Sequence, residues 1–274
     1  MKKHLSTIIL VLILIIGLSL LLYPTMADWW NSFHQSRAIA SYDEIMANIS
    51  PEDYNHLFEA AMEYNQRLRE IDYPLMYHDK LEGYFDLLDV TGNGIIGYIS
   101  IPKIDVQLPI YHGTSEGVLQ IAVGHVEGTS LPTGGESTHA VLSAHRGLPS
   151  ARLFTDLDKM EVGDTFMISV IDRTLTYEVD QILIVNPTDV EPLYVTEGED
   201  YCTLVTCTPY GINSHRMLVR GTRVENAKEA KVIRVTADAA IVEPIFVAPF
   251  VAAPILLVLL IGLMIPNPKK RREE

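Results

Sequence analysis

Two long apolar runs, one near each end of the 274-residue chain, constrain its fold more than any other feature. Residues 5–23 and 245–265 contain no Asp, Glu, Lys or Arg, and each is close to the ~20 residues that a helix needs to cross a bilayer. Basic residues lie beyond the outer end of each run, at residues 2–3 and within residues 267–274. Because basic flanks stay on the cytoplasmic side, we expect both termini in the cytoplasm and residues 24–243 outside the cell.

The first run has a second interpretation, as a secretory signal peptide that ends at the small-residue site "TMA". Its length exceeds the roughly 7–15 residues of a signal-peptide apolar region. We therefore expect that residues 1–23 form an uncleaved membrane anchor. The second run contains Pro249 and Pro254, which membrane helices tolerate. We therefore predict a transmembrane helix over residues 244–266 and a cytoplasmic tail over residues 267–274.

The segment between the runs is strongly acidic. Six of the 21 Lys and Arg residues and two of the 35 Asp and Glu residues lie outside residues 24–243, so this segment carries 15 basic and 33 acidic residues, a net charge of −18. Nucleic-acid binding needs Lys and Arg to replace the counterions of phosphate. We therefore expect a soluble, exported domain with no nucleic-acid partner.

The pattern of this middle segment changes from helical to β. Residues 34–89, within a lead-in over residues 24–92, have apolar side chains at helical spacing, with Ser50-Pro51 as a cap and first turn. Residues 93–224 are short β-branched segments broken by Pro and Gly, which indicates an all-β sandwich or barrel. Helix formers over residues 225–243 predict a linker to the second apolar run.

Two cysteines stand five residues apart in the segment "YCTLVTC". An odd spacing puts Cys202 and Cys207 on opposite faces of a strand, so we expect no disulfide between them. Cys207 ends the strand because Pro209 cannot donate to a ladder. Cys202 is more plausible as a small core residue, and Cys207 is either packing or a nucleophile.

A nucleophilic cysteine needs a base or cation nearby to favour the thiolate. His215 and Arg216 are close in sequence but point in opposite directions on a strand, so only one of them can face Cys207. His145 also ends a β-branched run. The histidines show no metal-binding spacing such as H-x-x-x-H, so we predict no metal site.

The segment "TLVTCTPYGINSHRMLVRG" resembles the active-site strand of sortases, whose signature is T-L-x-T-C followed by Arg. "GYISIPKIDVQLPIYHGT" and the segment around "HRGLPS" are similar to the class C, pilin-polymerising branch of that family. The resemblance covers about residues 84–224. It implies a closed, sortase-type β-barrel over residues 93–224, with an N-terminal helical segment before it. Two transmembrane helices are expected to flank this domain.

The resemblance also implies a site. Cys207 would attack the Thr–Gly carbonyl of an L-P-x-T-G-type signal and form a thioester. His145 would act as acid and then base, and Arg216 would donate hydrogen bonds to the substrate oxygen. The implied reaction uses no cofactor, and its partners would be pilins or surface proteins that carry such signals.

Class C enzymes commonly carry a lid with an Asp-Pro-aromatic motif over the active site. The corresponding region here reads "REIDYPLMYHDKLEGYFDLLD", in which a tyrosine separates the aspartate from the proline. By resemblance, Asp72 would face Arg216 and Tyr73 would cover Cys207. The altered order puts such a lid in doubt.

Two other functions remain open from the sequence. A housekeeping sortase would attach proteins to peptidoglycan, but such enzymes usually lack a C-terminal membrane span. A membrane-tethered binding or scaffold protein would use the barrel surface without thiol chemistry. The presence of Cys207, His145 and Arg216 together favours an enzyme.

Overall fold

The computed structural model describes residues 2–226. The expected transmembrane helix at 244–266, the tail at 267–274 and most of the linker at 225–243 lie outside these residues. Contacts divide the chain into two units, one that includes residues up to Thr25 and one that begins at Met26 and contains the barrel. One described helix is long and apolar enough to cross a membrane, with a mean hydropathy of 2.5 in its most apolar window.

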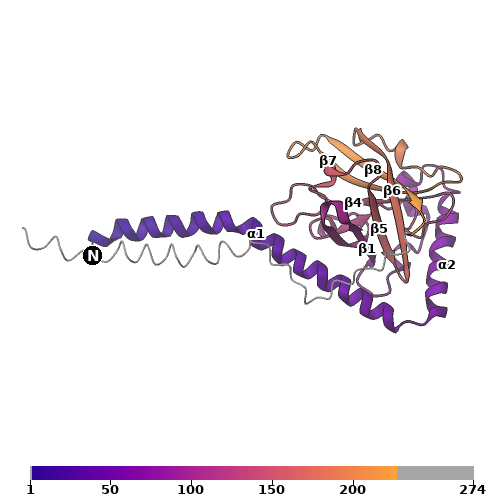
Figure 1. Ribbon diagram of the computed structural model, residues 1–274, viewed down its shortest axis with the longest axis horizontal. Helices are drawn as coiled ribbons and strands as arrows, with labels where there is room; N and C mark the ends of the chain where they lie inside the picture. The colour runs from indigo at the N-terminus through magenta and orange to yellow at the C-terminus, as the bar shows by residue number, and fades with distance from the viewer. Residues whose placement is uncertain (1, 227–274) are drawn as a thin grey trace, which may run out of the picture. The chain divides into compact units, whose positions relative to one another are not determined.

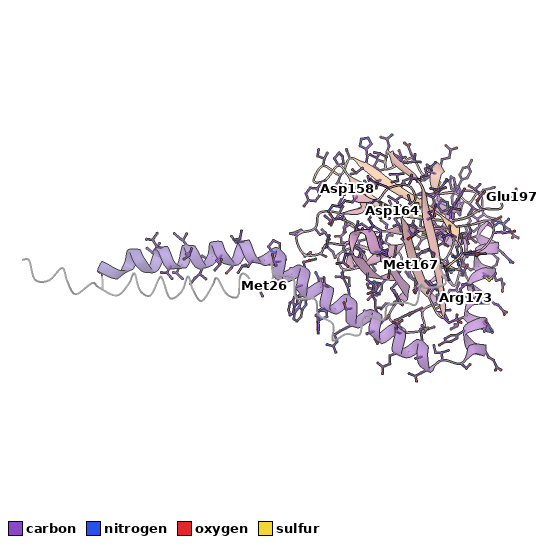
Figure 2. The ribbon with its side chains drawn as sticks, in the orientation of Figure 1. Met26, Asp158, Asp164, Met167, Arg173 and Glu197 are labelled. Carbon is purple, nitrogen blue, oxygen red and sulfur yellow. The ribbon has the colours of Figure 1, made fainter. Side chains whose placement is uncertain are left out.

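Two long helices precede the barrel. Helix α1 runs over Lys2–Asn48 and passes through Pro24, and α2 runs over Pro51–Leu68 and begins at the proline of the expected first turn. Phe58, Ala61 and Tyr64 lie on one face of α2 and are buried. Arg173 is the first residue of strand β6 (Arg173–Val185), and its guanidinium lies 3.8 Å from the ring centroid of Phe58. This contact holds α2 beside the sheet (Figures 1 and 2).

The lead-in beyond α2 contains only short turns. Helix α3 covers Pro74–Tyr77, and single 3₁₀ turns cover His78–Lys80 and Tyr84–Asp86. Helical structure is thus confirmed for α1 and α2, but the expected helix does not continue to residue 89. Helix α2 ends at Leu68. A proline at position 74 and Gly83, which has a φ of 90°, keep the chain beyond it from forming one continuous helix.

Eight strands form a closed barrel, which confirms the fold class expected from the sequence. Their order around the barrel is β1-β2-β3-β4-β7-β8-β6-β5. Pairs β2/β3 and β4/β7 are parallel, and the other pairs are antiparallel. The strands are β1 Ile95–Ile101, β2 Val106–His112, β3 Val123–His125, β4 Thr138–Ser143, β5 Thr165–Val170, β6 Arg173–Val185, β7 Asp200–Thr208 and β8 His215–Val224.

The two faces of the sheet carry separate hydrophobic clusters. Inward residues such as Leu142, Leu204 and Val219 belong to the main core, which also includes buried residues of α1 and α2. On the outer face, Val141, Val205 and Leu218 form a second cluster with partly buried neighbours. Because successive strand residues alternate between faces, each of these strands contributes to both clusters.

Candidate functional site

The two cysteines lie on opposite sides of the barrel wall. Cys202 is fully buried in the main core, and this burial raises the pKa of its thiol well above the usual value. Cys207 is partly exposed, and both cysteines are free thiols. Val205 alternates onto the face of Cys207 and belongs to the outer cluster. A thiol on the outer face of the barrel is accessible to a reagent or substrate.

Arg216 lies directly opposite Cys207. The antiparallel pairing of β7 with β8 matches Cys207 with Arg216 and Thr208 with His215. Directly paired residues point to the same face, so the arginine is the residue that faces the thiol. Its Nη1 donates to the backbone carbonyls of Asn213 at 3.3 Å and of His215 at 3.1 Å. Its guanidinium therefore lies close to the start of β8, and within residues 2–226 it forms no ion pair.

His145 follows the strand that pairs in parallel with β7. Ser143 is matched with Val205. The next residue, Ala144, donates its N–H to the Val205 carbonyl at 3.2 Å and accepts the Thr206 hydroxyl at 2.9 Å. Continuation of this register brings His145 to the level of Cys207. The strand-end positions of all three candidate residues therefore meet on one rim of the barrel.

The His145 imidazole has a nitrogen without a hydrogen-bond partner. Its Nε2 is buried and unpaired among the described residues, and the closest carboxylate oxygen, Oε2 of Glu116, lies at 3.9 Å. The His145 side chain as a whole is 28% exposed, so a modest rotation of the ring would bring a nitrogen that has no hydrogen-bond partner toward a molecule bound at the thiol.

The loops that follow His145 and Cys207 pack against each other. Gly147 has a φ of 77°, and a Cβ at this position would lie 2.8 Å from the ring of Tyr210. Arg146 pairs with Asp158, and its guanidinium lies 5.9 Å from the Tyr210 ring centroid. Close contact at a glycine fixes the spacing of the two loops. The positions of His145 and Cys207 are thereby linked through packing as well as through the sheet.

An apolar surface lies beside Cys207 on the outer face of the barrel. Its base is the buried cluster Val141, Val205 and Leu218, and its accessible part is the partly buried neighbours Val126, Leu183, Val185 and Leu193. Alternation in "TLVTC" could have identified Val205 as part of this surface. The loop residues Val126 and Leu193 carry no sequence signal that brings them here. An extended peptide with apolar side chains could lie along this surface.

The segment of the expected lid contacts the loop that follows β3. The backbone of Pro74 packs on Gly128, where a Cβ would lie 2.4 Å from the Pro74 carbonyl oxygen, and His78 lies 3.3 Å from Glu127. Asp72 and Tyr73 are exposed, and within residues 2–226 Asp72 forms no ion pair with Arg216. The segment is instead held near the loop that follows β3.

That segment also lines a cavity away from the thiol. The cavity, of about 380 Å³, is bordered by Ile71, Pro74, Gly128 and His139. His139 is matched with Tyr201, six residues before Cys207, or roughly 20 Å along the strand. This cavity is therefore separate from the rim that carries Cys207.

Three other histidines, His112, His125 and His139, are buried in the barrel. His125 donates from Nε2 to the Ser130 carbonyl at 2.8 Å and accepts the Tyr84 hydroxyl at Nδ1, also at 2.8 Å. Burial lowers the pKa of His125 to about 4. Burial also lowers the pKa values of His112 and His139. In the described part of the chain, no group of three His, Cys, Asp or Glu side chains could hold a metal ion.

Comparison with known proteins agrees with the closed barrel. The Sortase domain model matches residues 99–224. Sortase C1 from Streptococcus agalactiae is 49% identical, with 70% of this chain and 100% of that chain covered at a TM-score of 0.64. Sortase C from Streptococcus pneumoniae is 46% identical, with 69% and 97% covered at a TM-score of 0.63.

These similarities define the family. The chain belongs to the sortase family, and its similarity to sortase C structures places it in class C. Sortase D from Bacillus subtilis (strain 168) is 30% identical over 131 residues, or 47% of this chain. That match spans 63% of the Bacillus protein, less than two thirds of its length.

Proposed function

We propose that this chain is a membrane-anchored cysteine transpeptidase. It cleaves an LPxTG-like sorting signal between Thr and Gly and transfers the acyl group to a lysine amine of another pilin subunit. The observation that carries the proposal is the arrangement at one barrel rim, where Cys207 faces Arg216 and the segment of His145 is hydrogen-bonded to the strand of Cys207.

The first half of the reaction forms a thioester. The Cys207 thiolate attacks the carbonyl carbon of the signal threonine, and the carbonyl oxygen takes up negative charge. Arg216 donates hydrogen bonds to this oxygen, because its guanidinium lies across the strand pair from the sulfur. The C–N bond then breaks, and His145 gives a proton to the departing glycine amine.

The second half reverses the roles of these groups. A lysine amine attacks the thioester carbonyl, His145 takes a proton from the amine, and the C–S bond breaks. Cys207 leaves as a thiolate and an isopeptide bond remains. The lack of a hydrogen-bond partner at Nε2 of His145 among the described residues supports this role, and the Glu116 carboxylate lies 3.9 Å from this nitrogen.

The substrate class follows from the family branch and from the outer surface. The similar Streptococcus pneumoniae enzyme is a sortase C with pilin substrates. Near Arg216, the partly buried side chains of Val185 and Leu183, which pack on the outer cluster, offer apolar contacts to the leucine and proline of a sorting signal. Pilins and other surface proteins that carry such a signal are therefore the proposed partners.

The location follows from the ends of the chain. The N-terminal apolar helix is an anchor candidate, and sortases are membrane-associated proteins with an extracellular catalytic domain. The basic residues beyond both apolar runs support cytoplasmic termini and an extracellular barrel.

Trapping of the thioester tests this function. The full-length chain in detergent is mixed with a peptide that contains an LPxTG signal, and its intact mass is measured with and without a pilin peptide that contains lysine. We expect the acyl fragment on Cys207, and its transfer to the lysine peptide when that peptide is present. A folded protein that forms no adduct with the signal peptide, and behaves the same with a scrambled one, would reject the proposal.

A further inference from the structure

An exposed aromatic face lies on α1, outside the candidate site. Met26, Trp29, Trp30 and Phe33 are 48–58% exposed, and Trp29 stacks on Phe33 with ring centroids 6.2 Å apart. All four belong to the same unit as the barrel, and Figure 2 marks Met26 on α1 outside the barrel. Four large apolar side chains left open to water on one helix face are unfavourable without a partner.

The opposite face of α1 holds the barrel. Asp28 accepts the backbone N–H of Arg152 at 2.8 Å, and Asn31 donates to the Ser150 carbonyl at 2.8 Å. One helical turn further, Gln35 donates to the Ile121 carbonyl at 2.7 Å. Residues three and four apart share a helix face. The aromatic side chains therefore point away from the barrel and cannot be covered by it.

The chain position of this face identifies what covers it. Trp29 follows the last residue of the apolar run by six residues, which is about 9 Å of helix. The headgroup layer on each side of a bilayer is about 5–8 Å thick, and tryptophan is enriched there because its ring is apolar and its N–H is polar. Met26 is three residues, or about 4.5 Å, beyond the run, and Trp29 is at the outer edge of this layer.

We propose that the face formed by Met26, Trp29, Trp30 and Phe33 binds the headgroup region of the lipid bilayer. This inference rests on the proposed membrane anchorage. It adds a second contact with the membrane, beyond the apolar run. Because the other side of α1 binds Ser150 and Arg152, the segment that follows His145 lies about one helix diameter, roughly 10 Å, from the aromatic side. The candidate site is thereby held close to the membrane surface.

The chain offers a direct probe of this face, because Trp29 and Trp30 are its only tryptophans. The full-length protein is reconstituted in phosphatidylcholine vesicles with bromine on the lipid chains, either close to the headgroup or close to the chain end. We expect strong quenching of tryptophan emission, and more by the shallow bromines than by the deep ones. Flotation of the same vesicles on a density gradient measures anchorage separately.

A matched variant moves the tryptophan to an exposed position elsewhere. Trp29→Phe/Trp30→Phe/Val162→Trp carries its only tryptophan at Val162, which is 67% exposed in the turn before β5. We expect this variant to float and to show no quenching. Floating wild-type protein with unquenched emission would overturn the inference and leave the anchor intact, and blue-shifted but unquenched emission would indicate a protein cover. Protein that does not float would overturn both the proposed lipid contact and the proposed membrane anchor. Thioester formation in detergent tests the catalytic proposal independently.

Discussion

Cys207 and Cys202 are the same side chain in two environments, and their substitution should have different effects. Cys207→Ala should abolish thioester formation, because it removes the proposed nucleophile from the barrel rim. Cys202→Ala should preserve the reaction and lower the free energy of unfolding by about 1–2 kcal/mol, since it leaves a small gap in the core. Intact-mass measurement and urea unfolding of both variants test this. Equal loss of activity in two well-folded variants would contradict the assignment.

Arg216 should matter for the geometry of its guanidinium as well as for its charge. Arg216→Lys keeps the charge but loses the planar fork, so we expect the rate of signal cleavage to fall by ~10²–10³-fold. Arg220→Lys is the matched control, because it lies on the same face of β8 and pairs with Asp180 at 2.6 Å. It should retain most of the activity. Similar losses in both variants would indicate a general need for arginine on this face.

Alternation along one strand was enough to separate the two cysteines and to show that only one of His215 and Arg216 could face Cys207. The register selects Arg216. The approach of His145 could not be derived in this way, because it depends on the parallel pairing of β4 with β7. Residue patterns do not report pairing between distant strands, so only the family resemblance suggested it. The catalytic roles of the three residues remain predictions.

At the scale of elements, the segment over residues 71–78 should not latch the site. Asp72 is exposed and the segment packs on Gly128. We therefore expect Asp72→Ala to change the alkylation rate of Cys207 by less than about tenfold, the scale of a weak, exposed ion pair. A small thiol reagent and mass spectrometry measure this rate. A rise of a hundredfold or more would mean that Asp72 holds a cover over the thiol.

Element prediction succeeded where the pattern was long and failed where it was short. The spacing of apolar residues in α2 and the start at Pro51 were readable, as was the β character of residues 93–224. Strand β3 has only three residues, Val123–His125, too few to show a period. The segment after α2 had helical composition, but packing on Gly128 and the breaks at Pro74 and Gly83 outweighed it.

At the scale of the whole molecule, the barrel should lose stability in mild acid. Burial lowers the pKa of His125 to about 4, below the usual value near 6.5. The unfolded chain therefore takes up a proton before the folded barrel does, and stability falls between pH 6.5 and pH 4. Protonation would also break the hydrogen bond that Nδ1 accepts from Tyr84. His112 and His139 act in the same direction.

Urea unfolding at pH 7.5 and pH 5 measures this effect. The His125 term alone should lower the free energy of unfolding by about 2 kcal/mol at pH 5. His125→Gln should reduce this pH dependence, whereas His56→Gln, at an exposed position on α2, should leave it unchanged. The same free energy of unfolding at both pH values would contradict a neutral, buried His125.

The parallel pairing of β4 with β7 has a consequence for the order of folding. Cys207 and Arg216 lie on the last two strands of the described barrel, and the segment of His145 joins them through a pairing that spans about 60 residues of chain, a non-local contact that forms slowly. A chain that is synthesised from its N-terminus presents its histidine loop before its thiol. The barrel must close before sulfur, guanidinium and imidazole meet. An incompletely folded chain therefore carries a thiol without its partners and remains chemically inert toward its substrate.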